Sequence, residues 1–300
     1  MFCVLIYAAI YFLIPGKIYF AKAVYVKTNI NSVKRFLYDE NNWHSWWPRV
    51  SGLNRDLNTY KNYDYTIKRK MYEGTDIAVL HDGKTINTFL HLVSVNRDST
   101  AIEWKGEMEE TINPIKKIYA YFFATQVKHN MSEILASAKV FLEKKENIYG
   151  HNIIQEKVKD TLLISTKYFS KTHPSTEDIY KLINKLKEYI SAQGASETNY
   201  PMLNVTQDSS EFKTMVAIPI NKNIAENQTF VIKKMVPGKI LVAEIKGGQK
   251  TVTDAIDKVN IYMEDNHLVA PAISFESLIS DRAKEKDSTK WITKIYFPIY

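Results

Sequence analysis

Apolar and polar residues alternate along short segments of the first half of the chain, with the period of strands that bury one face. This alternation predicts a series of antiparallel strands, with a turn at residues 81–83 between two of them. The segments that show it are 17–27, 63–72, 75–83, 85–96, 99–108 and 118–127.

A helical pattern follows these strands. Apolar residues recur at steps of three and four, which predicts one long helix that ends near Gly150. Asn130 and Glu133 stand where a capping pair would begin this helix. The apolar positions are Met131, Ile134, Leu135, Ala138, Phe141 and Leu142.

A cluster of tryptophans lies between the first and second strands. We expect a short helix here, capped by Asn31, and then the stretch NNWHSWWPR, which holds three of the five tryptophans of the chain. Trp43, Trp46 and Trp47 have the spacing that places side chains on one helical face. That face forms either part of the wall of a ligand cavity or plain core, and core is the favoured interpretation.

The second half of the chain contains one pattern twice: strand, helix, strand, strand. The two copies end alike, in AIPI and in YFPI, which indicates an internal duplication with a period of about 75–80 residues. Ser175 and Thr251 are expected to open the two helices, each with an aspartate three positions on. The predicted strands are 153–169 (one strand or a pair), 200–207, 212–220, 236–248, 272–279 and 290–299.

The first fifteen residues, MFCVLIYAAIYFLIP, carry no charge and are followed by lysines. A spanning helix needs about 20 apolar residues, with about 17 a practical minimum, and Gly16 would extend this run. We therefore expect an uncleaved membrane anchor over residues 1–16, on a side of the membrane that the flanking charges do not decide. The alternatives are a cleaved secretory signal and a buried helix or strand.

The composition, 45% hydrophobic and 24% charged residues, is that of a globular protein and argues against disorder. The net charge is +7, but the basic residues are scattered, and an ordinary basic surface is favoured over nucleic-acid binding. The sequence has no GxGxxG or GxxxxGK motif and no histidine pair at i, i+4. We therefore expect neither a cofactor nor a metal.

The first half, in the order of its predicted elements and in the stretch VKRFLYDENNWHSWWP, resembles the START-like superfamily, also called SRPBCC or polyketide-cyclase-like proteins. The resemblance implies a helix-grip fold over residues 17–149: a curved antiparallel sheet around the long helix, with a hydrophobic cavity between them.

The second half resembles the GyrI-like family, whose fold also forms the effector-binding domain of some AraC- and MerR-type activators. The resemblance is carried by Pro237-Gly238-Lys239 leading into AEIKGG, by Phe275-Glu276 and by the closing IYFPI. It covers residues 150–300. No helix-turn-helix precedes it, so the role of a transcription factor does not transfer. The predicted fold class of the whole chain is α+β.

The GyrI-like resemblance implies a central pocket lined by aromatic rings, with an acidic residue at its floor, for which Glu276 is the match. The ligand would be a hydrophobic or cationic aromatic molecule. Glu276 would pair with a cationic or hydrogen-bonding group of this ligand, while rings stack on its flat face. Tyr200, Trp291 and Tyr296 are the candidate rings, and Glu244 is a second candidate carboxylate, either pocket-facing or exposed.

The expected function is small-molecule binding, as a membrane-tethered sensor or carrier. One alternative is a hydrolase in which Glu276 activates water and Tyr200 or Tyr296 assists the leaving group. A second is a lipid-binding or transfer protein that uses the START-like cavity and the tryptophans. The sequence favours binding over catalysis.

Overall fold

The structure is a computed structural model that describes residues 16–49, 58–108, 113–208 and 210–300. It divides into two compact units, residues 1–148 and 149–300. The predicted anchor, except for Gly16, lies outside the described residues. Among the helices that the structure does describe, none is both long enough and apolar enough to cross a membrane.

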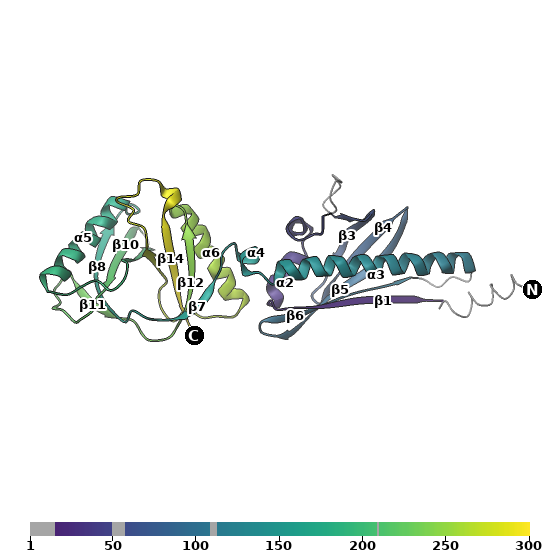
Figure 1. The fold of residues 1–300 in the computed structure, drawn as a ribbon, viewed down its shortest axis with the longest axis horizontal. Helices are drawn as coiled ribbons and strands as arrows, with labels where there is room; N and C mark the ends of the chain where they lie inside the picture. Colours follow the sequence, from purple (N-terminus) through teal and green to yellow (C-terminus); the bar gives the residue numbers. More distant parts are fainter. Residues whose placement is uncertain (1–15, 50–57, 109–112, 209) are drawn as a thin grey trace, which may run out of the picture. The chain divides into compact units, whose positions relative to one another are not determined.

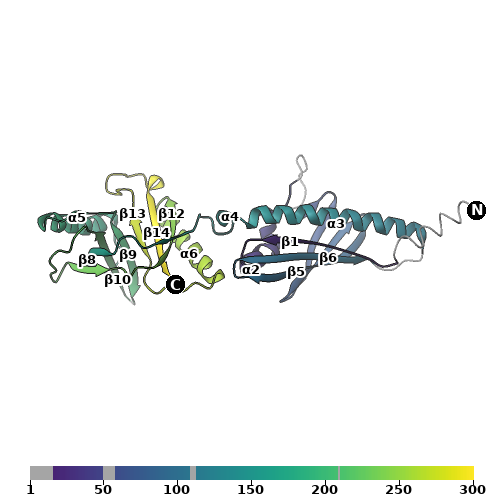
Figure 2. The ribbon, with the colours of Figure 1, turned by 60° about the horizontal axis from the view of Figure 1, so that its bottom comes forward.

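The first unit is a six-stranded antiparallel sheet with a long helix along it (Figure 1, Figure 2). The strand order is β1-β6-β5-β4-β3-β2, so the sheet is a meander whose last strand, β6, returns to pair with β1. Its elements are β1 (Ile18–Val26), α2 (Ile30–Leu37), the 3-10 helix η1 (Glu40–Ser45), β2 (Thr59–Tyr60), β3 (Tyr63–Lys70), β4 (Gly74–His81), β5 (Lys84–Asn96), β6 (Ser99–Met108), α3 (Pro114–Leu142) and α4 (Lys145–Tyr149).

The prediction of a strand over residues 118–127 is wrong, because this segment belongs to α3. The helix begins at Pro114, and the side chain of Asn113 caps it by accepting from two backbone N–H groups. Asn130 and Glu133 therefore lie inside the helix, not at its start. Aromatic residues favour strands, but the buried positions in this segment, Ala120, Phe123, Ala124 and Val127, have helical spacing.

The three tryptophans are core residues of the first unit. Trp43 and Trp47 stack with ring centroids 4.7 Å apart and planes 6° apart, and Trp46 packs against both rings. Trp43 is 1% exposed, and its indole N–H donates to the carbonyl of Leu37 at 3.0 Å. The short helix before them is capped by Asn29 and not, as predicted, by Asn31. The tryptophan rings therefore pack on each other, which the core interpretation predicts.

The core of the first unit also buries tyrosines, which makes its stability sensitive to alkaline pH. Burial raises the pKa of Tyr65, a fully buried residue of β3, and raises that of Tyr38 to about 12. An unfolded tyrosine ionises near pH 10. The stabilisation that these neutral phenols contribute is therefore complete below about pH 10 and is lost as the pH rises toward their folded pKa values.

We expect Tyr65→Phe to make the free energy of unfolding less steeply dependent on pH above about pH 10, by up to about 1.4 kcal/mol per pH unit. Urea unfolding of the two proteins, at a series of pH values, measures the slope. Tyr72→Phe is the control, because the ring of Tyr72 lies in solvent. If the free energy of unfolding depends on pH equally steeply in wild type and Tyr65→Phe, the raised pKa of Tyr65 does not cause the alkaline sensitivity.

The second unit is an eight-stranded antiparallel sheet with the order β11-β8-β10-β9-β13-β14-β12-β7. Helix α5 packs on β8 and β10, and α6 packs on β12 and β14 (Figure 1). Its elements are β7 (Ile154–Lys157), β8 (Leu162–Ser170), α5 (Thr176–Ala192), β9 (Met202–Asp208), β10 (Glu211–Pro219), β11 (Val231–Lys234), β12 (Lys239–Lys246), α6 (Gln249–Asp265), β13 (Phe275–Leu278), the 3-10 helix η2 (Ser288–Lys290) and β14 (Ile292–Ile299).

The strand order reflects the duplication. Each copy contributes one half of the sheet, and the two halves meet where β9 pairs with β13. The short strand that precedes each copy pairs with the other copy: β7 lies on β12, and β11 lies on β8. The sequence did not predict β11. A pseudo-twofold arrangement follows, in which every strand of one copy has a counterpart in the other.

The two helices begin differently. Ser175 caps α5 in a complete capping box with Asp178, as predicted. The prediction for α6 is three residues too late, because Gly248 is its N-cap and Gln249 its first residue. Gly247 has a φ of +141°, and a Cβ there would lie 2.8 Å from the hydroxyl of Thr251. The turn before α6 therefore needs glycine, and this turn sets the position of Gln249.

Candidate functional site

A cavity of about 770 Å³ lies in the second unit, on the face of the sheet opposite α5 and α6. Its floor is a small apolar cluster of Leu163, Met202 and Ala217, against which Met235 and Phe275 pack. Neighbouring residues on the same strands belong to a separate apolar cluster beneath α5. Because successive side chains of a strand point to opposite faces, the two clusters mark a helix face and a cavity face of the sheet.

Two crossing connectors form part of the cavity wall. One joins β7 to β8, and the other, residues 235–238, joins β11 to β12. They are bonded to each other: Val158 N–H donates to the Gly238 carbonyl at 3.0 Å, and Met235 N–H donates to the Thr161 carbonyl at 2.9 Å. Each connector links an edge strand in one half of the sheet to a strand in the other half. The exchange of edge strands therefore builds this wall.

The rim of the cavity is cationic. No Asp, Glu or His lies among the lining residues, and in the described part of the chain the rim lysines form no ion pair with a carboxylate. Four of these lysines are exposed and one, Lys213, is half-buried. The rim lysines are Lys167, Lys213, Lys233, Lys234 and Lys239. An apolar floor below unpaired ammonium groups is thus the chemistry that this cavity offers.

Glu276 lies on the helix face and not in this cavity. It sits opposite Leu203 of β9 and Ile295 of β14, and Leu203 packs beneath α5. The carboxylate accepts from the side-chain amide of Gln249, at the start of α6, at 2.9 Å. Glu276 is 9% exposed. It is therefore a buried carboxylate at the centre of the sheet, close to the start of α6.

A cation of the chain itself pairs with Glu276. Arg282, from the segment between β13 and β14, places Nη2 3.4 Å from the Glu276 carboxylate and donates to the Thr293 hydroxyl at 2.7 Å. Its Nη1 donates to the Gln249 side-chain carbonyl at 3.1 Å. The guanidinium lies over the Trp291 ring, 4.9 Å from its centroid. We refer to these five residues as the Glu276–Arg282 cluster.

Helix α5 also holds the segment that carries Arg282. The Arg282 N–H donates to the Tyr180 hydroxyl at 2.6 Å, and this hydroxyl donates to the Ser280 carbonyl at 3.2 Å. A tyrosine hydroxyl is protonated at neutral pH, and burial raises the pKa of Tyr180 further, so this hydroxyl is available as a donor. Arg282 is therefore fixed from both helices, by Tyr180 on one side and by Gln249 on the other.

Of the predicted aromatic residues, Trp291 belongs to the same cluster as Glu276, and Tyr296 does not. Tyr296 lies opposite Phe275 in the sheet, and the two rings stack with centroids 4.9 Å apart. Since Glu276 is the next residue of β13, Tyr296 and Glu276 point to opposite faces. A hydrolytic pair of these two residues is not assembled in this structure.

The remaining two predicted residues lie elsewhere in the second unit. Tyr200 precedes β9 and is 48% exposed. Glu244 is exposed on β12, with its carboxylate 3.6 Å from the ammonium of Lys294. The ligand-binding roles of Glu276, Tyr200, Trp291, Tyr296 and Glu244 stay predictions.

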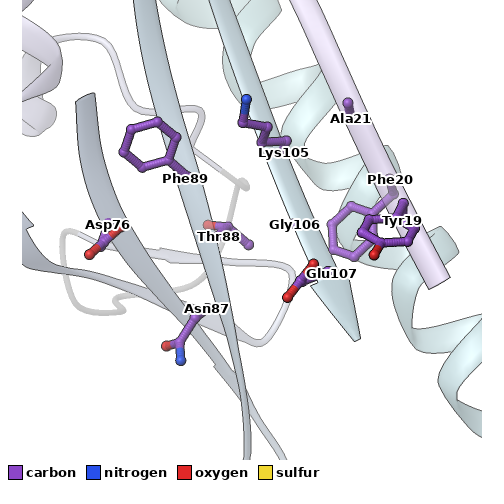
Figure 3. A pocket seen from close by; sticks show the side chains of 10 residues that line it. All are labelled: Tyr19, Phe20, Ala21, Asp76, Asn87, Thr88, Phe89, Lys105, Gly106 and Glu107. Carbon is purple, nitrogen blue, oxygen red and sulfur yellow. The ribbon is translucent and has the colours of Figure 1, made fainter. Parts of the chain in front are cut away.

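The first unit has a smaller depression, of about 530 Å³, on its sheet, between β1, β4, β5 and β6 (Figure 3). The charges around it are already paired within the chain. Asp76 lies 2.8 Å from Arg69, and Glu107 lies 3.0 Å from Lys17. Lys105 pairs with a glutamate of its own strand at 3.5 Å. A ligand would have to compete with these pairs, so the cavity of the second unit is the better candidate.

Sequence reasoning missed Arg282 and the rim lysines. Arg282 lies in an irregular segment, where no periodicity indicates which way a side chain points. Lys167 had a usable signal, because it shares a strand face with Leu163 and is separated from it by an even number of residues. In the sequence the lysines have the pattern of scattered charges, since the pairing of β8 with β10 and β11 is not visible there.

Comparison with known protein families gives a match in the second unit. Residues 167–300 match the family described as a GyrI-like small molecule binding domain. These residues form a GyrI-like domain. The GyrI-like domain contains all of the Glu276–Arg282 cluster and most of the cavity wall.

Solved structures with a similar fold include the C-terminal domain of EcmrR, at 17% identity and a TM-score of 0.43, over 50% of this chain and 98% of that one. SAV2435 bound to tetraphenylphosphonium has 16% identity and a TM-score of 0.34, over 50% and 94% of the two chains. A hydrolase from Listeria innocua has 12% identity and a TM-score of 0.36, over 49% and 91%. Because these TM-scores are low, the assignment of the second unit as GyrI-like rests on the family match alone.

No curated protein matches the chain. The curled six-stranded sheet and long helix of the first unit are consistent with a START-like fold. The family comparison places its match in the second unit, so a START-like relationship of the first unit stays a prediction.

Proposed function

We propose that this protein binds a small molecule in the cavity of its GyrI-like domain and acts as a sensor or carrier of that molecule. The observation that carries the proposal is the cavity itself. Its volume of about 770 Å³ lies within the range of about 300–1,000 Å³ in which drug-sized ligands bind. Its floor is apolar, with methionines that adapt to the shape of a ligand.

The apolar sequence of residues 1–15 supports the further proposal that this binding takes place at a membrane, to which the chain is tethered. A membrane-anchored domain with an apolar cavity would meet hydrophobic molecules where they are most concentrated.

A second candidate ligand is a lipophilic cation at the Glu276–Arg282 cluster. The observation that favours it is the position of the guanidinium, which lies over Trp291 and pairs with Glu276. The cluster thus already accommodates a planar cation, although this cation belongs to the chain itself.

Filling the cavity tests the main proposal. Ala272 lines the cavity and is exposed, so Ala272→Trp adds a ring to the cavity without disturbing the core. We expect the full chain to bind the uncharged fluorophore N-phenyl-1-naphthylamine. Ala272→Trp should weaken this binding at least about tenfold, because a loss of about 1.4 kcal/mol of binding free energy lowers the affinity tenfold.

Ala225→Trp is the matched control, because Ala225 is an exposed residue of the same domain that does not line the cavity. Fluorescence titration measures both affinities. If the wild-type protein does not bind the fluorophore, or if the two variants lose affinity equally, the cavity is not the binding site.

A further inference from the structure

The two copies in the GyrI-like domain differ in charge at corresponding positions on the cavity face. In the first copy, Lys167 of β8 lies directly opposite Met215 of β10. The corresponding pair in the second copy is Glu244 of β12 opposite Lys294 of β14, with 3.6 Å between ammonium and carboxylate. The lysine of the second copy is therefore neutralised, whereas Lys167 has an uncharged neighbour.

The exchanged edge strands repeat this difference. Lys233 of β11 lies opposite Leu163 of β8. At the corresponding place in the other half, Glu156 of β7 lies opposite Ile240 of β12, and Glu156 pairs with Lys159 at 3.2 Å. A lysine in one half of the sheet thus again corresponds to a paired glutamate in the other half.

Four of the five rim lysines consequently lie in the half of the sheet formed by β8, β10 and β11, and Lys239 of β12 is the exception. Lys167 lies four positions beyond the floor residue Leu163 on the same strand, and Lys233 lies across from Leu163 on β11. Lys213 lies further along the neighbouring strand, on the same face as Met215. Like charges held around one cavity without counter-ions repel each other, and an anion placed among them relieves this repulsion.

The other side of the cavity is apolar except for Lys239, which lies opposite Ile299. Phe275, stacked on Tyr296, faces the floor, and residues 271–273 and 298–300 supply prolines and aliphatic or aromatic side chains. A ligand that satisfies both sides has one anionic end and one apolar end. A neutral or cationic ligand would leave the lysines without a counter-charge.

We infer that the ligand of this cavity is an amphipathic anion, with a carboxylate or phosphate head group at Lys167 and Lys233 and an apolar body against Phe275. The inference rests on the proposed function and adds the chemical class of the ligand. Charge-assisted hydrogen bonds from the two ammonium groups would hold the head group, and burial of the chain or ring system would supply most of the affinity.

Matched twelve-carbon probes test the inference. Isothermal titration calorimetry of the full chain compares dodecanoate, dodecyl phosphate, 1-dodecanol and dodecylamine, at low and at physiological salt. We expect at least one of the two anions to bind about tenfold more tightly than the alcohol, because a charge-assisted bond contributes more than a neutral one. We also expect the anion's affinity to fall as salt screens the lysines.

Charge-removal variants locate the head group. Lys167→Gln/Lys233→Gln should weaken the anion about tenfold and leave the alcohol unchanged. Lys185→Gln/Lys250→Gln removes the same charge from α5 and α6, away from the cavity, and should change neither affinity.

The outcomes separate the two proposals. Equal affinity for anion, alcohol and amine, or equal losses in both lysine variants, would overturn the inference and leave the proposed binding function in place. Failure of the wild-type protein to bind any of the four probes, or the uncharged fluorophore, would overturn both.

Discussion

Arg282→Ala is expected to lower the free energy of unfolding of the GyrI-like domain by about 3–5 kcal/mol, because it leaves the Glu276 carboxylate buried without its partner. The side chains of Arg282 and Glu276 are 4% and 11% exposed, so solvent screens this pair little. The substitution also removes the bonds to Gln249 and Thr293 and the contact with Trp291. Differential scanning calorimetry of the full chain would measure the loss.

Two further variants establish that charge is the cause. Glu276→Gln/Arg282→Met removes both charges and fills the space with an apolar side chain, and should recover a large part of the lost stability. Lys290→Ala, at an exposed neighbour in the same segment, should change stability by less than about 0.5 kcal/mol. If the double variant is as unstable as Arg282→Ala, the loss comes from packing and not from the unpaired carboxylate.

The same variant tests the second candidate ligand. Arg282→Ala vacates the space over Trp291 and next to Glu276, so a lipophilic cation should now bind there and restore stability. Phenylguanidinium is a suitable probe, because it is planar and apolar at one end and is close in size to the removed side chain, and benzoate is the control of opposite charge. A rise in melting temperature with the cation in the variant, larger than in wild type, supports a site that Arg282 occupies. An equal response of both proteins contradicts it.

Trp43→Ala is expected to destabilise the first unit by about 3–5 kcal/mol, the usual cost of deleting a large buried aromatic side chain. Trp43 stacks on Trp47, meets the edge of Trp46 and donates to the Leu37 carbonyl, so the substitution removes three contacts together. Four of the five tryptophans lie in this unit. Tryptophan fluorescence during urea unfolding therefore reports mainly on it.

His44→Gln is the matched control, because His44 is the exposed neighbour of Trp43 in the same turn. It should shift the unfolding midpoint little. A small loss for Trp43→Ala, similar to that of His44→Gln, would indicate that the tryptophans enclose a space and do not fill a core. The ligand-wall interpretation of these residues would then be preferred.

Several elements of this fold could be predicted from the local spacing of apolar residues, because their buried face repeats along one stretch of chain. The strands of the first unit from β3 to β6 and both copies of the duplicated unit were predicted in this way. The capping box of Ser175 with Asp178 is likewise a local signal, because all its atoms lie within one helical turn.

Prediction failed where two local signals disagreed. Residues 118–127 combine aromatic residues, which favour strands, with a helical spacing of buried positions. The spacing prevails because α3 buries one continuous stripe against the sheet from Ala120 to Leu142. Glu276 shows a second limit of prediction from the sequence. Alternation correctly separated it from Phe275, but its partner Arg282 comes from an irregular segment.

The sequence by itself determined the α+β class, the duplication and the GyrI-like character of the second half, because periodicity, repeated endings and short motifs are properties of contiguous residues. Tertiary structure decided which charges are paired and which are free. Strand pairing places Lys167 beside Met215 but Glu244 beside Lys294, and it buries Arg282 against Glu276. Such pairings join residues far apart along the chain, so only folding determines the electrostatics of the cavity and of the cluster.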